Sequence, residues 1–112
     1  MDNKKFKGLI YRSVAYIEGL LMANMYEKKE YLSIIKPILN NEINDVQEFK
    51  NSVNYSILND DLMKVINNLE YYFLFRNETD MNKLQDEENL KGFLSCFPEN
   101  IKRDIVEELE RG

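Results

Sequence analysis

Apolar residues recur every three or four positions along almost the whole of this chain, which is the spacing of one face of an α-helix. The longest such series lies near the N-terminus and consists of Phe6, Leu9, Ile10, Val14, Ile17, Leu21 and Met25. Only four glycines and two prolines occur in 112 residues, which argues against an all-β fold with many tight turns. The spacing therefore predicts an all-α fold, a compact single-domain bundle of about five to six helices over residues 1–112.

The first predicted helix is apolar on more than one side. The residues that widen its apolar face are Tyr11, Ala15, Tyr16 and Met22. We therefore expect a central helix that is covered on more than one side. Gly8 and Gly19 lie in its interior, where each costs roughly 1 kcal/mol relative to alanine, and we expect them to admit the close approach of another helix.

Shorter helices are predicted to follow the first one. They begin near Lys28, Asp45, Asn59 or Asp60, Asp86 and Pro98. Asp45 can accept from the free amides of a first helical turn, and Pro98 is suited to the first position of a helix. Pro37 lacks a backbone donor, so we expect a kink or an early end there, followed by a turn at Asn40 and Asn41.

Few residues suited to catalysis are present. The absence of histidine excludes Ser–His and Cys–His nucleophile pairs, and a single cysteine, Cys96, excludes the common zinc sites and any disulfide within the chain. No phosphate loop, dinucleotide fingerprint or calcium loop occurs. We therefore predict a protein that is not an enzyme, with no catalytic residue, no metal site and no cofactor. Chemistry based on paired carboxylates is the remaining alternative.

The same sequence gives expectations about location. Cys96 is expected to be a buried, inert thiol. No window of 18 residues is free of charge, so no membrane span and no membrane partner are predicted. The N-terminus lacks the uninterrupted apolar run of a secretory signal. A cytoplasmic protein is the expectation.

Charge is unevenly distributed along the chain. Residues 1–36 carry seven Lys or Arg and four Asp or Glu, whereas residues 37–112 carry eight and sixteen, which gives −5 overall. A net-acidic chain repels phosphate, so no nucleic-acid partner is predicted. Acidic residues either keep the protein soluble or raise its encounter rate with a basic partner.

The segment Glu70–Phe75 is apolar nearly all round if it is helical. Tyr72 and Arg76 continue the inward stripe, while Tyr71 and Phe75 lie on a neighbouring arc. Either residues 77–85 cover that arc, or Tyr71 and Phe75 form an aromatic anchor for a partner protein or a homodimer. The carboxylates that would surround such an anchor are Asp60, Asp61, Glu70, Glu78 and Asp80.

A second acidic group lies at the end of the last predicted helix and comprises Glu107, Glu108 and Glu110. The helix dipole disfavours negative charge at this end. The group is therefore either a solvated face or a surface retained for a partner.

Two functional hypotheses follow from these patterns. In size, charge and helicity the chain resembles bacterial toxin-immunity proteins and phage-encoded inhibitors. The likeness implies a small acidic inhibitor that binds a basic protein, such as a nuclease toxin, by charge complementarity and an aromatic anchor. The alternative is a homodimeric adaptor, chaperone or regulatory helical module.

Overall fold

The computed structural model describes residues 2–52 and 55–111, in which the chain forms eight α-helices, one short 3-10 helix and no β-strand. In chain order these are α1 (Asn3–Glu27), α2 (Lys29–Leu39), α3 (Val46–Ser52), η1 (Tyr55–Ile57), α4 (Asp60–Asn67), α5 (Leu69–Asn77), α6 (Met81–Leu84), α7 (Glu87–Leu94) and α8 (Glu99–Arg111). The all-α class is confirmed, but eight helices replace the predicted five to six. Met1, Val53, Asn54 and Gly112 of the predicted domain lie outside the described residues.

The count differs because one apolar stripe contains a break in the backbone and one predicted loop contains a short helix. The stripe expected to be one helix from Asp60 to Arg76 divides at Asn68, whose side-chain amide donates to the carbonyls of Lys64 and Ser95. Such local amide bonds compete with helical ones. Residues 77–85, which were expected to form a loop, contain the one-turn helix α6, and the Asp80 side chain caps its N-terminus. Periodicity alone does not detect a break of one residue.

The positions of the helix ends agree more closely with the sequence-based predictions than the number of helices does. Asp45 accepts from the amides of Gln47 and Glu48, as a capping residue should. α2 continues only two residues beyond Pro37, and the predicted turn follows, with Asn41 at a φ of 61°. These features depend on neighbours in the sequence, which is why the sequence predicts them.

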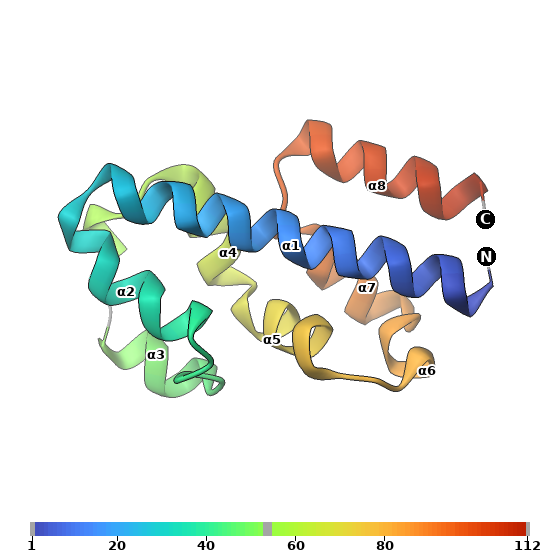
Figure 1. Ribbon diagram of the computed structural model, residues 1–112, viewed down its shortest axis with the longest axis horizontal. Coiled ribbons are helices and arrows are strands. Elements are labelled where there is room, and N and C mark those ends of the chain that lie inside the picture. The colour runs from blue at the N-terminus through green and yellow to red at the C-terminus, as the bar shows by residue number, and fades with distance from the viewer. Residues whose placement is uncertain (1, 53–54, 112) are drawn as a thin grey trace.

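Figure 1 shows α1 running across one face of the molecule, with α8 on one side of it and α5 and α6 on the other. α2, α4, α5 and α8 all contact α1. The core beneath α1 contains aromatic and branched side chains, among them Ile17, Leu21, Tyr31, Leu62, Tyr72 and Phe93. The N-terminal end of α1 and the C-terminal end of α8 lie side by side (Figure 1).

A polar junction around Arg76 joins α1, α2 and α5. The Tyr72 hydroxyl donates to Glu18 Oε2 over 2.9 Å and accepts from Arg76 Nη1 over 3.2 Å. Arg76 also donates to the carbonyl of Ile38, at the end of α2. Burial, and then the bond to the Glu18 carboxylate, raise the pKa of Tyr72 to about 12. The junction thus keeps Tyr72 neutral and ties three helices together.

Candidate functional site

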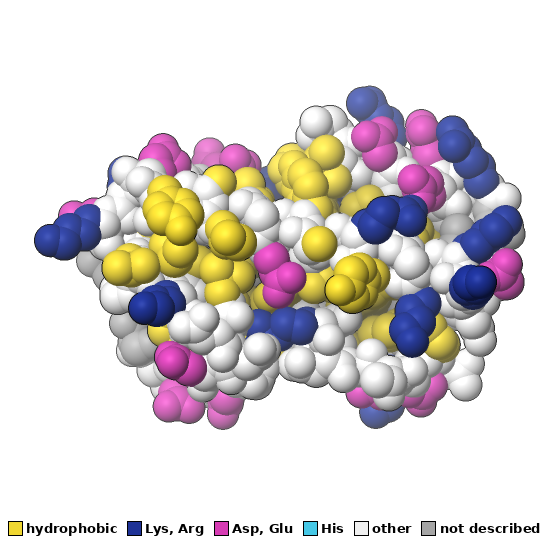
Figure 2. All heavy atoms as spheres, viewed as in Figure 1, with side chains coloured by type: hydrophobic (Ala, Val, Ile, Leu, Met, Phe, Trp, Pro, Cys, Tyr) yellow, Lys and Arg dark blue, Asp and Glu magenta, His cyan; other side chains and the backbone are white. Residues whose placement is uncertain are grey.

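The most unusual surface of the molecule is the side of α1 that faces solvent. It consists of Tyr11, Ala15, Tyr16, Gly19, Met22, Ala23 and Tyr26, and we call it the α1 face. Tyr11 and Tyr26 are 78% and 81% exposed, and Tyr16 and Met22 are 41% and 46% exposed. Figure 2 shows hydrophobic side chains gathered along the course of α1, with Lys and Arg concentrated at the end where the termini lie.

One exposed charged side chain, that of Arg12, lies on the same side of α1 as these residues and pairs with Glu108. The exposed residues of α1 from position 13 to position 26 are all tyrosine, methionine, alanine or glycine. Glu18, the charged residue of this stretch, is half-buried and accepts the hydrogen bond of Tyr72. A surface helix normally places polar residues on its solvent side. A contiguous apolar surface of this kind is typical of an interaction site.

Two expectations about α1 are corrected by the structure. α1 was expected to be covered on more than one side, with its tyrosines at a half-exposed edge, but Tyr11, Tyr16 and Met22 are exposed although four helices contact α1. Gly8 and Gly19 were expected to admit a close helix. A Cβ at Gly19 would meet nothing within 4 Å, and one at Gly8 would meet only the end of the Arg12 side chain at 3.8 Å. The cost of Gly19 in the helix is therefore not offset by packing within the described chain.

A cleft of about 360 Å³ lies beside the α1 face, between α1 and the segment that joins α5 to α6. Tyr11 and Ala15 line one wall, and Phe75, Met81 and Leu84 contribute to the other. The lining also contains charged residues, which are Lys7, Glu18, Arg76 and Glu78. The cleft therefore gives the α1 face a concave edge that is partly apolar and partly charged.

The predicted aromatic anchor is wrong for Phe75, which is only 4% exposed. Its ring stacks on Phe93 of α7, with ring centres 4.1 Å apart. Tyr71 is half-buried and packs on Gly92, where a Cβ would lie 2.4 Å from the tyrosine ring. Both residues belong to the contact between α5 and α7. The neighbouring arc of α5 is thus covered by the chain itself, mainly by α7.

The acidic residues predicted to surround that anchor lie apart from one another. Asp60 and Asp61 are exposed in the first turn of α4, Glu70 is exposed in the first turn of α5, and Asp80 caps α6. Glu78 lies 3.7 Å from the Lys83 ammonium. Glu107, Glu108 and Glu110 belong to α8, which lies on the opposite side of α1 from α5 and α6 (Figure 1). The predicted carboxylates therefore do not form a single acidic face.

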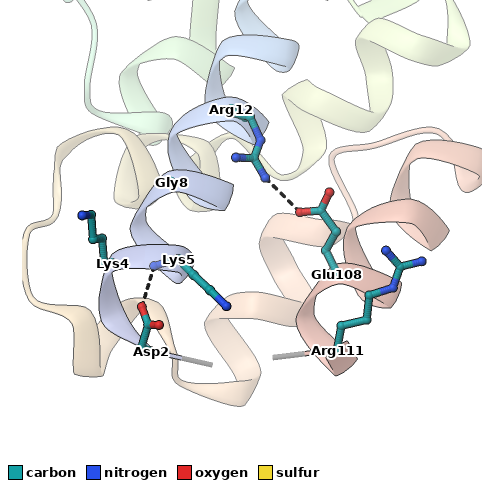
Figure 3. Close-up of a pocket in the computed structure, with 7 residues that line it drawn as sticks. All are labelled: Asp2, Lys4, Lys5, Gly8, Arg12, Glu108 and Arg111. Atoms are coloured by element: carbon teal, nitrogen blue, oxygen red, sulfur yellow. Dashed lines mark hydrogen bonds and ion pairs between the residues drawn. The ribbon is translucent and has the colours of Figure 1, made fainter.

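The acidic end of α8 lies against the basic end of α1. Glu108 Oε2 accepts from Arg12 Nη2 over 2.9 Å. Figure 3 shows this ion pair at the edge of a cleft of about 600 Å³, which four cations and two carboxylates line. The lining residues are Asp2, Lys4, Lys5, Gly8, Arg12, Glu108 and Arg111. Placing carboxylates at the end of α8 is therefore explained by the cations of α1 beside them.

Replacing Glu108 with glutamine should change the free energy of unfolding by less than about 1 kcal/mol, because both partners of this ion pair are largely exposed. Urea denaturation at low and high salt measures the effect. A loss several times larger would mean that the pair is essential for docking α8.

We find no protein family, curated protein or solved structure that matches this chain. Among the described helices, none has both the length and the apolar character needed to cross a membrane. Within residues 2–52 and 55–111, no three Cys, Asp or Glu residues lie close enough together to hold a metal ion. Fold and surface are therefore the observations from which a function can be argued.

Sequence reasoning missed Tyr11 and Tyr26 as site residues and assigned them to a helix edge. One signal could have found them. A helix that is apolar on more than one side, with an interior glycine that no other element needs, has more apolar surface than a bundle of this size covers.

Proposed function

We propose that this protein acts by binding another protein molecule through the α1 face, as a helical interaction module without catalytic activity. The observation that carries the proposal is the pair Tyr11 and Tyr26, each about four-fifths exposed at the two ends of a largely apolar helix surface. Tyrosine is enriched among the residues that dominate binding energy at protein interfaces. Burying two such rings beside Met22 removes a large apolar area from water.

A charge-steered inhibitor has less support, because its predicted carboxylates lie on different sides of the molecule. If the α1 face is the binding surface, neutralising Glu107, Glu108 and Glu110 together should leave the association rate almost unchanged. Removing the rings in a Tyr11→Ser, Tyr26→Ser variant should weaken binding by about a hundredfold or more. Stopped-flow association measurements with both variants distinguish the two surfaces. A large loss of association rate in the glutamate variant, with little loss of binding in the tyrosine variant, would contradict the proposal.

Site-specific photo-crosslinking tests the proposal and identifies the partner in the same experiment. A photoreactive phenylalanine at position 11 or 26 replaces an exposed ring and should leave the fold intact. We expect crosslinks from both positions to one protein, at adjacent residues that mass spectrometry identifies. Asn51, which is exposed on α3, a helix that lies apart from α1 (Figure 1), provides the matched control position. Equal crosslinking from all three positions, or none, would overturn the proposal.

A further inference from the structure

We infer that the molecule that covers the α1 face is a second copy of this chain, whose own α1 lies antiparallel and crosses near Gly19. The inference rests on the proposed function, because it names the occupant of the same surface. Three properties of α1 favour a second copy: its shape, the order of its charges and its exposed area.

The shape of the α1 face is complementary to itself. Ala15, Gly19 and Ala23 are four residues apart, so they form a row of small side chains along the helix, with larger side chains on either side. Because a Cβ at Gly19 would meet nothing within 4 Å, a second backbone can approach closely there. Tyr11 lies eight residues before Gly19 and Tyr26 seven after it. An antiparallel crossing therefore places Tyr11 of each copy beside Tyr26 of the other.

The charges of α1 favour the antiparallel arrangement over the parallel one. Residues 3–14 contain four Lys or Arg and no acidic residue, whereas residues 15–27 contain two Glu and no Lys or Arg. This order opposes the dipole of α1 itself, which favours acidic residues at the N-terminal end. An antiparallel crossing at Gly19 sets residue 11 of one copy opposite residue 27 of the other, so it brings Arg12 of each copy beside the exposed Glu27 of the other. A parallel copy would bring like charges together.

Two of these charges already have neighbours within the chain. Arg12 pairs with Glu108 of α8, and Lys28, which follows the end of α1, lies over the Tyr31 ring. Lys7 is exposed one turn before Tyr11, and Glu27 is exposed at the end of α1. In the antiparallel crossing Glu27 comes beside Arg12 of the other copy, since their separation along the helix axis is about 1.5 Å, whereas Lys7 lies on the opposite flank of the helix.

The exposed area is close to what a dimer requires. Taking about 200 Å² for each large side chain, the four large residues of the α1 face and Leu32 of α2, which is 45% exposed, present on the order of 500–600 Å². The small residues between them and the edge of the adjoining cleft add to this. A stable interface buries about 800 Å² on each partner.

The mass of the purified full chain in solution tests the inference directly. Sedimentation equilibrium at about 100 µM should give twice the chain mass of 13.4 kDa. Tyr26→Ala should raise the dissociation constant at least about tenfold, and Gly19→Leu should do the same by blocking the crossing. The Tyr26 ring is exposed, and a Cβ at Gly19 would meet nothing within 4 Å of the same chain. Both variants should therefore keep the far-ultraviolet circular dichroism of the native fold. Asn51→Ala on α3 is the matched control and should remain dimeric.

Disulfide crosslinking tests the orientation. An equal mixture of Tyr11→Cys and Tyr26→Cys chains should form a mixed dimer rapidly, because the two positions meet across an antiparallel crossing. Tyr11→Cys alone should link slowly, since its two copies then lie about 24 Å apart along the helix axis. Fast linking of Tyr11→Cys alone would overturn the antiparallel arrangement. Glu27→Lys should weaken the dimer, because it places a second cation beside Arg12 of the other copy.

A chain that remains monomeric at about 100 µM overturns the second copy as the occupant. The photo-crosslinking result then decides the fate of the proposed function separately. Crosslinks from positions 11 and 26 to a different protein would uphold binding through the α1 face, whereas their absence would overturn both.

Discussion

Replacing Phe93 with alanine should reduce the free energy of unfolding by about 3–5 kcal/mol. The Phe93 ring is fully buried. It stacks on the Phe75 ring, with ring centres 4.1 Å apart, and packs edge to face with the Phe97 ring, with ring centres 5.2 Å apart. Its removal leaves a cavity between α5 and α7 that the rings around it cannot fill without moving from their packed positions. Domains of this size are stable by about 5–15 kcal/mol, so the variant should lose a large part of the total.

Urea denaturation with matched variants measures this effect. Tyr11→Ala removes a ring that is exposed, so it should change the stability of the monomer by less than about 0.5 kcal/mol. Both variants should be measured at concentrations low enough to keep the chain monomeric. A loss below about 1 kcal/mol for Phe93→Ala would show that the contact between α5 and α7 is not part of the core.

Raising the pH from 9 to 12 should destabilise the protein progressively. Burial raises the pKa of the Cys96 thiol from 9.0 to about 12, and burial with the bond to Glu18 raises that of Tyr72 from 10.0 to about 12. Below pH 9 both groups are neutral in the folded and the unfolded chain, so neither group lowers the free energy of unfolding there. Above the ordinary pKa values only the unfolded chain releases the protons, so stability falls until the pH passes about 12.

The expected loss is large. At about 1.4 kcal/mol for each pKa unit, Cys96 accounts for up to about 4 kcal/mol and Tyr72 for up to about 3 kcal/mol. Urea denaturation at intervals between pH 8 and pH 11 measures the slope, and Cys96→Ala and Tyr72→Phe should each make it shallower. Stability that stays constant between pH 9 and pH 11 would show that neither proton is held by the fold.

Local features of the helices were predictable from the residues. Asp45 caps α3 and Asn40 and Asn41 end α2, as expected, and α8 begins at Glu99, one residue after the predicted first position at Pro98. Each of these depends on contacts within a few positions of the chain. The break at Asn68 was not predictable in this way, because one of its amide bonds reaches Ser95, 27 residues away.

The candidate site was not predictable from the spacing of apolar residues. Phe75 and Tyr11 both lie on a second apolar arc of a helix, and the pattern treats them alike. In the folded chain α7 returns to cover Phe75, while the arc of α1 that contains Tyr11 stays open to solvent. The pattern shows that an arc is apolar, but it does not show which segment of the chain packs on it.

The residues by themselves therefore determined the all-α class, several helix ends and the lack of imidazole chemistry, since these depend on composition and on near neighbours. Only the tertiary structure decided which apolar side chains are buried and whether the carboxylates gather on one face. Burial and charge clustering arise from contacts between segments distant in the chain, and such contacts have no period in the sequence.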